Sequence, residues 1–565
     1  MRFKSEENEW LFVMESELWN LPQEETSILP ALRLSYCHLP TELRSCFAYC
    51  AIFPKDFEIE KEKLIHLWMA NDLIAVKGNM EVEEVGNEIC KELYWRSFFE
   101  GVQSKNDGFD NIYGFKMHDL VHDLAQCIME DEARVVEIDC PVNLSRARHV
   151  TFNYSNQSFD MLFAFQKIET LRTLMLTRHC PFSIEARKFP SHLYFPSLRA
   201  FDAKDSLLTS ISFLTNTSKH IRYLNLSGFS SLRHMPPNFG KLTCLRTLSI
   251  FIVGRRRGCD VDELGSLNLH GDLRIKNLEE VKSPMEAKKA NLAGKMNLKR
   301  SELSWDRNEK SQVIIKQVLE SLEPPPKNES YGGELEGGFL QLQSLLITDL
   351  PNLEMLSKEE RRMAFARPSS LHIEKCSKLT LHCLRPIKEL IIWGCSEALL
   401  RIVSNLHTLT SLEICDNDDV ASFPDGFPQK LTTLQSLTIK RFSKFQDLQS
   451  NMLIGLSSLE SLTITFYHML ECFLVEIFRG SYSLKSIYIE DCIKFKSLST
   501  SFGDLTALEF LELRGCPELE PFPNGLNNLS CLKSMMLLGY STYRDDGSQN
   551  LSVPHPKLTT LPKAL

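Results

Sequence analysis

One short stretch of the chain combines residue types and spacing that could support chemistry. The segment KMHDLVHDLAQ (116–126) places His118 and His122 four residues apart, a separation that can ligate zinc from one helix face. A third ligand is not evident, so we do not predict a metal site. Asp119 stands where a helix would begin and suits an N-terminal cap, with His118 in the adjacent polar corner.

A second kind of chemistry, phosphate transfer, would need a glycine-rich loop ending in Gly-Lys-Ser or Gly-Lys-Thr. The Gly-Lys pairs of the chain are Gly240–Lys241 and Gly294–Lys295, followed by Leu and Met. Without backbone amides around the phosphates and a lysine on them, nucleotide hydrolysis has no machinery. We therefore expect a chain that is not an enzyme, neither hydrolyses ATP nor binds ADP tightly, and needs no cofactor of its own.

Composition narrows the class of partner and the compartment. The 565 residues include 64 Lys and Arg against 73 Asp and Glu, a net charge of −9, which disfavours nucleic-acid binding. The 17 cysteines are scattered, which is typical of free thiols in a reducing compartment. A membrane span would need about 18 consecutive apolar residues, and neither such a run nor a signal peptide is evident. These features predict a cytoplasmic protein.

Internal repeats dominate the elements that must position any site. The template L-x-x-L-x-L recurs at intervals of 24 or 25 residues, in copies beginning at Leu409, Leu434, Leu459, Leu484, Leu508 and Leu532. Less regular copies begin at Leu171, Leu198, Ile221, Leu245, Leu298, Leu342 and Ile387. Alternating apolar residues indicate a short strand, and one repeat cannot fold alone. We predict a leucine-rich-repeat solenoid with a parallel concave sheet, with strands at 409–414, 434–439, 459–464, 484–489 and 508–513.

The residues between the inward apolar positions form the predicted partner-binding surface. Its charged and large members are Glu413, Lys440, Tyr488, Glu490, Phe510, Glu512, Arg514 and Met536, and Cys415 and Thr465 also fall at outward positions. Aromatic, Arg and Met side chains are enriched at interface hot spots. The alternative is an ordinary solvated sheet face. Buried turn positions are predicted for Cys395, Asn417, Cys492 and Cys516.

The first 140 residues have a different pattern. Apolar stripes predict helices at 60–74, 80–100 and 116–129, and the Asn-, Asp- and Gly-rich stretch 102–115 predicts a β-hairpin between the last two. Helices followed by a hairpin and another helix indicate a winged-helix module. Cys46 and Cys50 lie in an apolar helical run and are expected in its core. A winged helix can bind DNA, but the acidic residues of its last helix would repel phosphates.

Three motifs resemble one family. CFAYCAIFPKDFEI (46–59), KMHDLVHDLAQ (116–126) and the leucine-rich block at 267–306 are similar to plant nucleotide-binding leucine-rich-repeat disease resistance proteins of the coiled-coil class. The resemblance implies a switch in which ADP in a P-loop domain holds the protein closed until the repeats perceive an effector. It also implies that His118 and Asp119 sense ADP, but only together with a P-loop domain.

These observations give a domain plan and a hypothesis. We expect a remnant of the first helical module at 1–30, a winged-helix module at 31–140 and repeats at 145–565, with a Pro- and Gly-rich break at 321–338. The chain is then a truncated family member lacking the P-loop domain, whose repeats bind a pathogen effector or a guarded host protein. Its winged-helix module would contact a nucleotide-binding domain. The alternatives are a complete ATP/ADP-dependent switch, if an upstream P-loop domain exists, and a degenerate adaptor without signalling activity.

Overall fold

The protein consists of two compact units, residues 1–272 and 273–565, which we describe separately. The computed structural model describes residues 30–103, 112–136, 144–154, 168–178, 193–206, 209–228, 231–305, 317–318, 321–322, 344–348, 350, 369–376, 378–379, 387–394, 396–415, 423–424, 427–428, 430–442, 453, 455–472, 482–497, 505–519, 529–539 and 553–554.

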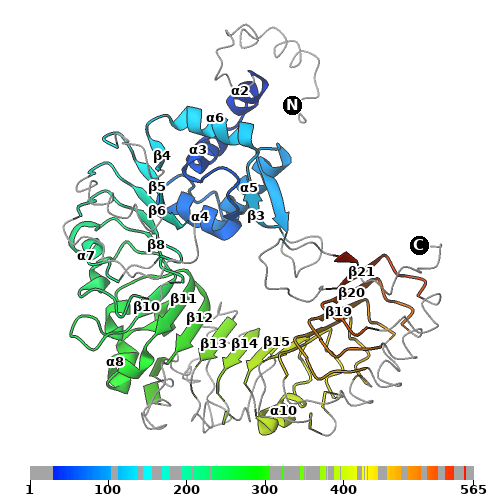
Figure 1. Cartoon of the computed structure of the whole chain (residues 1–565). Coiled ribbons are helices and arrows are strands. Elements are labelled where there is room, and N and C mark those ends of the chain that lie inside the picture. The colour runs from blue at the N-terminus through cyan, green and yellow to red at the C-terminus, as the bar shows by residue number, and fades with distance from the viewer. Residues whose placement is uncertain are drawn as a thin grey trace, which may run out of the picture. The chain divides into compact units, whose positions relative to one another are not determined.

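The first unit begins with a winged-helix module (Figure 1). Its helices are α2 (Pro30–Cys37), α3 (Thr41–Tyr49), α4 (Lys61–Ala70), α5 (Val82–Trp95) and α6 (Asp119–Met129). Strands β1 (Ile59–Glu60), β2 (Glu100–Gln103) and β3 (Ile112–Lys116) form an antiparallel sheet in the order β1-β3-β2. The three predicted helices and the hairpin strands between the last two are confirmed.

Helix α5 shows how the sequence specifies this module. Val85, Ile89 and Leu93 recur every four residues and are all buried, so they form the inward stripe of the helix. The Glu84 carboxylate accepts the backbone N–H of Glu81 at 3.2 Å, one half of a capping box that fixes where the helix begins.

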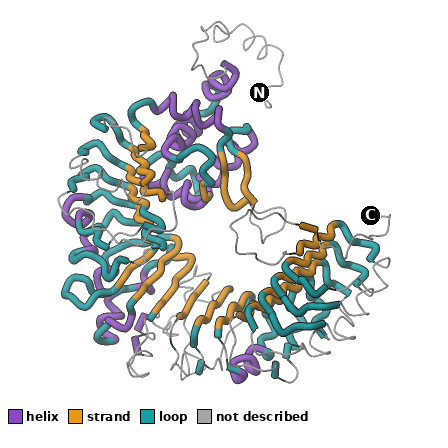
Figure 2. Tube along the Cα trace, in the orientation of Figure 1, coloured by secondary structure: helices purple, strands orange, loops and turns teal. Residues whose placement is uncertain are grey.

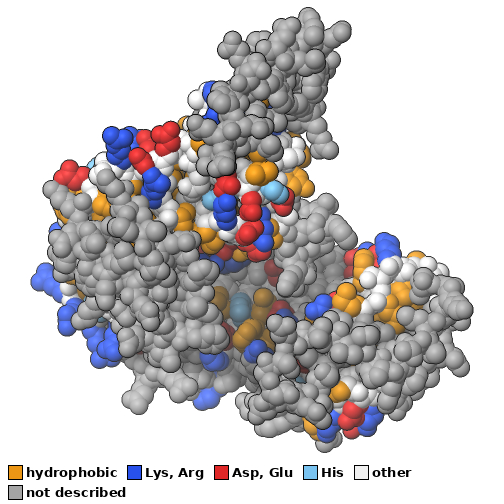
Figure 3. Space-filling model, turned by 45° about the horizontal axis from the view of Figure 1, so that its top comes forward, with side chains coloured by type: hydrophobic (Ala, Val, Ile, Leu, Met, Phe, Trp, Pro, Cys, Tyr) orange, Lys and Arg blue, Asp and Glu red, His pale blue; other side chains and the backbone are white. Residues whose placement is uncertain are grey.

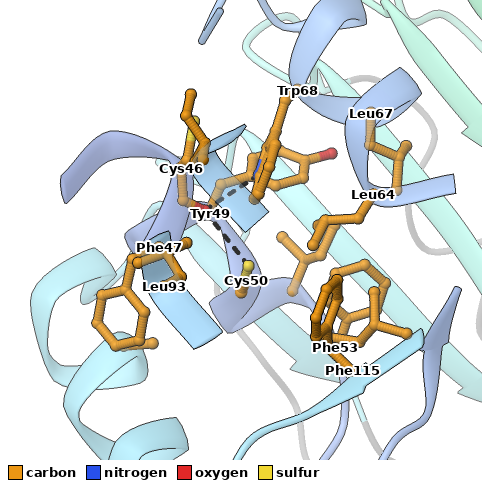
Figure 4. Packing of buried hydrophobic residues seen from close by; sticks show 14 of the residues in the cluster. Cys46, Phe47, Tyr49, Cys50, Phe53, Leu64, Leu67, Trp68, Leu93 and Phe115 are labelled. Carbon is orange, nitrogen blue, oxygen red and sulfur yellow. Dashed lines mark hydrogen bonds between the residues drawn. The ribbon is translucent and has the colours of Figure 1, made fainter. Parts of the chain in front are cut away.

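The module core contains cysteines as well as aromatic residues (Figure 4). Cys46 and Cys50 are fully buried, as predicted. The backbone carbonyl of Cys46 accepts hydrogen bonds from Trp68 Nε1 at 3.1 Å and from Cys50 Sγ at 3.3 Å. Burial raises the pKa of both thiols above the usual value, so they remain protonated core groups.

A six-stranded sheet completes the regular structure of the first unit. It comprises β4 (Ala133–Val136), β5 (His149–Tyr154), β6 (Thr173–Arg178), β7 (Ala200–Asp202), β8 (Tyr223–Asn225) and β9 (Thr247–Leu248), paired in parallel and in chain order. Helix α7 (Phe213–Thr217) lies between β7 and β8 in the sequence, and β10 (Ile250–Ile252) follows β9. Strand β4 lies inside the range predicted for the winged-helix module, so the repeat sheet begins before residue 145.

Polar groups join the winged-helix module to this sheet. The Lys63 ammonium lies 2.9 Å from the Asp202 carboxylate, and both side chains are buried. Asn71 Nδ2 donates to Thr173 Oγ1 at 3.1 Å and to Tyr49 Oη at 3.2 Å. Because unpaired buried polar groups are costly, these contacts tie helix α4 to particular strands of the sheet.

The second unit contains one long sheet. Strands β11 (Gly271–Lys276, which crosses the unit boundary), β12 (Leu298–Ser304), β13 (Ser344–Thr348), β14 (Ser370–Glu374), β15 (Glu389–Trp393), β16 (Ser411–Cys415), β17 (Ser436–Lys440), β18 (Ser461–Thr465), β19 (Ser486–Glu490), β20 (Phe510–Arg514), β21 (Ser534–Gly539) and β22 (Val553–Pro554) follow one another in chain order. Neighbours from β12 to β21 pair in parallel, and β22 pairs antiparallel with β21. The predicted leucine-rich-repeat solenoid is confirmed, and its five named strands begin two residues later than predicted.

The strands of this unit form one layer, and the loops and helix α10 (Glu397–Val403) form a second layer along one face of this sheet (Figure 2). Helix α8 (Pro284–Lys289) lies between β11 and β12 in the sequence. Cys492 and Cys516 are buried at the predicted turn position. Cys395, Asn417 and residues 323–338 of the predicted break lie outside the described residues.

Candidate functional site

The parallel register arranges the outward residues of the second unit in rows. We call the outward positions of β12–β21 the sheet face. One row consists of Cα partners on neighbouring strands: Glu302, Leu346, His372, Ile391, Glu413, Thr438, Thr463, Tyr488, Glu512 and Met536. The next row contains Lys440, Thr465, Glu490 and Arg514. A repeat with two alternating inward residues therefore fixes which outward residues are neighbours.

Six of the eight predicted partner-binding residues lie together on three adjacent strands. We call Tyr488, Glu490, Phe510, Glu512, Arg514 and Met536 the β19–β21 cluster. Arg514 is its centre, because its guanidinium lies 5.9 Å from the centroid of the Tyr488 ring and forms an ion pair with Glu512. Arg514 Nη2 also donates to Met536 Sδ at 3.8 Å. These contacts hold a long side chain in place before any partner arrives.

The cluster combines this order with exposure. Phe510 is 39% exposed and Met536 is 43% exposed, so both apolar side chains are accessible to a partner. Partial burial, and then the hydrogen bond to Glu490, raises the pKa of Tyr488, so its hydroxyl remains a donor at neutral pH. An ordered arginine beside exposed apolar groups is the composition found at binding hot spots.

The other two predicted residues form a separate feature. The Lys440 ammonium lies 2.9 Å from the Glu413 carboxylate, across β16 and β17. Strand β18, which carries Thr463, lies between this pair and Tyr488, so Glu413 and Lys440 are not part of the cluster. Cys415 and Thr465 occupy the predicted outward positions of the register, but neighbouring side chains bury them, and Cys415 Sγ donates to Glu413 Oε1 at 3.3 Å.

The sheet face also contains residues that the sequence analysis missed. His372 and Trp393 lie on β14 and β15, with ring centroids 5.9 Å apart. Leu346 and Ile391 occupy the same row as His372 and are only partly buried. Burial lowers the pKa of His372, so its ring is neutral. The alternation of apolar and polar residues in SLHIE (370–374) could have indicated this strand, but the L-x-x-L-x-L template does not match it.

The Met117–His118–Asp119 motif lies between the end of strand β3 and the start of helix α6. Met117 is buried in the module core, whereas His118 and Asp119 are exposed. His118 Nδ1 accepts the backbone N–H of Leu120 at 3.3 Å, so His118 caps α6. The prediction that Asp119 is the cap is wrong, because Asp119 is the first residue inside the helix. Its negative charge there interacts favourably with the positive end of the helix dipole.

His122 lies in a different environment from His118. It is buried, and its Nε2 lies 2.8 Å from the carbonyl oxygen of Phe53. The two histidines therefore do not converge on a common point. Across the described ranges, we find no group of three His, Cys, Asp or Glu side chains that could hold a metal ion. The helices described above include none with the length and apolarity of a membrane span.

Comparisons with known proteins agree with this architecture. Residues 52–125 match the family model for the disease resistance protein winged-helix domain, and residues 261–390 match the model for R13L1/DRL21 leucine-rich repeats. Disease resistance protein RGA2 of Solanum bulbocastanum is 36% identical over 552 residues, which cover 80% of this chain and 53% of that protein. RGA1 of the same species is 34% identical, with 80% of this chain and 54% of that protein covered.

More distant relatives include ToMV resistance protein Tm-2(2) of Solanum lycopersicum, 28% identical with 39% of this chain and 23% of that protein covered. The solved TLR13–ssRNA13 complex matches with a TM-score of 0.41 and 17% identity, covering 72% of this chain and 58% of that chain, too distant to bear on function. The chain spans about half the length of the curated RGA relatives it matches. The winged-helix module and the repeats of this chain thus match the corresponding parts of plant nucleotide-binding leucine-rich-repeat disease resistance proteins.

Proposed function

We propose that this chain is the recognition portion of a plant immune receptor and acts by binding rather than by catalysis. Its β19–β21 cluster would bind a pathogen effector or a host protein that the receptor monitors. The observation that carries this proposal is the ordered Arg514, which lies over Tyr488 and beside the exposed Met536. Truncating such a central arginine commonly weakens an interface by about 2 kcal/mol or more.

The winged-helix module would couple recognition to a nucleotide switch. His118 and Asp119 are exposed side by side at the start of α6, where a second domain can reach them. The sequence lacks a phosphate-binding loop, so we propose that ADP is held by a P-loop domain and that these residues only sense it. Reading the genomic DNA upstream of Met1 for a P-loop frame tests this arrangement against an adaptor without signalling activity.

A binding experiment tests the recognition surface. The purified chain is immobilised and exposed to a panel of purified effectors from plant pathogens. We expect any specific binder to lose at least tenfold in affinity with Arg514→Ala and with Tyr488→Ala. Thr438→Ala is the matched control, since it lies in the same row as Tyr488 but outside the cluster. A binder that is insensitive to both cluster variants would place recognition elsewhere.

A further inference from the structure

Five arginines occupy the same position in consecutive repeats of the first unit. We call Arg148, Arg172, Arg199, Arg222 and Arg246 the arginine ladder. Each immediately precedes the first residue of a strand, from β5 to β9. The backbone N–H of each arginine from Arg172 onward donates to the carbonyl of the preceding arginine, at 2.6 to 2.9 Å. Neighbouring members therefore lie on adjacent strands, about 4.8 Å apart.

The structure shows how this ladder binds a carboxylate. Asp72, which follows helix α4, contacts two neighbouring members at once. Its Oδ2 lies 2.7 Å from Arg199 Nη1, and its Oδ1 accepts from Arg222 Nη1. The two oxygens of one anionic group thus match the spacing of two guanidinium groups, the geometry that favours arginine for carboxylate and phosphate.

The remaining positive charges are not neutralised in the same way. Arg148 lies 3.4 Å from Glu132, but both side chains are more than 40% exposed, so this pair can rearrange. Within the part of the chain that the structure describes, Arg172 and Arg246 have no carboxylate within 4.0 Å. The five arginines of the ladder therefore have two described carboxylates as partners, Glu132 and Asp72. Arg172 lies between the arginines that contact these carboxylates and contacts neither of them.

The repeat geometry itself does not require this excess. At the same position in later repeats, Glu460, Lys485, Glu509 and Lys533 alternate in sign. Lys485 lies 2.9 Å from Glu460, and Lys533 lies 2.7 Å from Glu509. Charged side chains of both signs lie side by side elsewhere on the described surface too (Figure 3). A run of like charges is thus specific to the first unit.

Burial and the like charges of Arg199 and Arg148 lower the pKa of Arg172, although Glu132 and Asp72 act in the opposite direction. An added anion between Arg148 and Arg172 would relieve this repulsion.

We propose that Arg172, together with Arg148, binds a compact phosphate-bearing anion in the bridging manner in which Arg199 and Arg222 bind Asp72. A compact anion fits better than an acidic protein segment, because Arg172 is only partly exposed and the next two arginines already share Asp72. Phosphate oxygens accept from two guanidinium groups as a carboxylate does, with more charge.

Calorimetry of the whole chain with sodium tripolyphosphate, near physiological salt, tests this site. We expect micromolar binding that weakens at least tenfold with Arg172→Gln and less with Arg172→Lys, which keeps the charge but loses the planar donor pair. Lys485→Gln, at the equivalent position of a paired repeat, should leave binding unchanged. Hydrogen exchange in residues 168–178 should slow when tripolyphosphate is added, which reports the site without relying on the variants.

Three outcomes would overturn the proposal. The first is the absence of tripolyphosphate binding to the wild-type chain. The second is an equal loss with Lys485→Gln and Arg172→Gln, which would indicate a nonspecific charge effect. The third is binding of a polyglutamate peptide, sensitive to Arg172→Gln, in the absence of tripolyphosphate binding, which would identify a protein segment as the occupant.

Discussion

The buried ion pair between Lys63 and Asp202 gives a sharp test of how the winged-helix module is held on the repeat sheet. The side chains are 9% and 2% exposed, and the Nζ–Oδ2 distance is 2.9 Å. Asp202 also accepts from Tyr223 Oη at 3.2 Å and from Asn225 Nδ2 at 3.3 Å. Lys63→Met keeps the length of the side chain but leaves a buried carboxylate held only by neutral donors.

Breaking a buried pair by removing one partner costs about 3–5 kcal/mol. Because the neutral donors still stabilise the carboxylate, we expect the lower end, about 3 kcal/mol. That corresponds to about a hundredfold faster local opening, at about 1.4 kcal/mol per tenfold. Hydrogen exchange measured by mass spectrometry on α4 and β7 should show this acceleration in Lys63→Met.

Lys55→Met is the matched control for this experiment. Lys55 lies 2.6 Å from Asp123 in the same module, but these side chains are 50% and 42% exposed. Exposed pairs contribute about 0–1 kcal/mol, so opening should change by less than about fivefold. Adding Asp202→Asn to Lys63→Met should recover part of the loss, because it removes the unpaired charge. If Lys63→Met and Lys55→Met accelerate exchange equally, the buried pair does not hold the module on the sheet.

Three further predictions follow from burial. Burial and then the nearby arginines lower the pKa of His149 to about 3, so its ring is neutral in the folded protein. Between about pH 6.5 and 3 the unfolded chain binds a proton there that the folded chain does not, so the free energy of unfolding should fall by about 1.4 kcal/mol for each unit by which the pH is lowered. Acid titration of His149→Gln should show a shallower slope. Gly86→Ala should destabilise the module by about 1–3 kcal/mol in chemical denaturation, since its Cβ would lie 2.6 Å from Ile65 Cγ2; an unchanged midpoint would show that α5 can shift. Leu532 and Met535 are only half-buried, so amides at 529–539 should exchange faster than those of β17–β20, and equal protection would indicate a cover on this end.

The repeat pattern was readable from sequence where Leu or Ile stands at the first template position, even in the copy beginning at Leu298, whose second template position is Ser301. Strand β14 was missed because Pro368 stands at the first template position. This proline does not prevent a strand, since strand β13 supplies the pairing and the inward residues Leu371 and Ile373 are buried. Tertiary context therefore tolerates departures that a local template does not.

The candidate site was predictable to the extent that register follows from period. Equal positions in the copies beginning at Leu484 and Leu508 place Tyr488 beside Glu512 without any knowledge of the fold. The central role of Arg514 was not predictable, because it depends on side-chain conformations that spacing does not determine. The contact of Lys63 with Asp202 was equally hidden, since no local pattern relates residues so far apart in the chain.

The two kinds of outward position, on the sheet face and just before each strand, can differ from repeat to repeat without changing the fold. Inward leucines are constrained by packing, so changing them affects the core. The sheet face and the residue just before each strand contribute little to that core, and both change character along the chain. At the residue just before each strand, the first unit carries a run of positive charges around Arg172, whereas the second unit carries paired positive and negative charges around Lys485. Because the same backbone carries both patterns, the charge pattern reflects what each surface contacts and not what the repeat needs in order to fold.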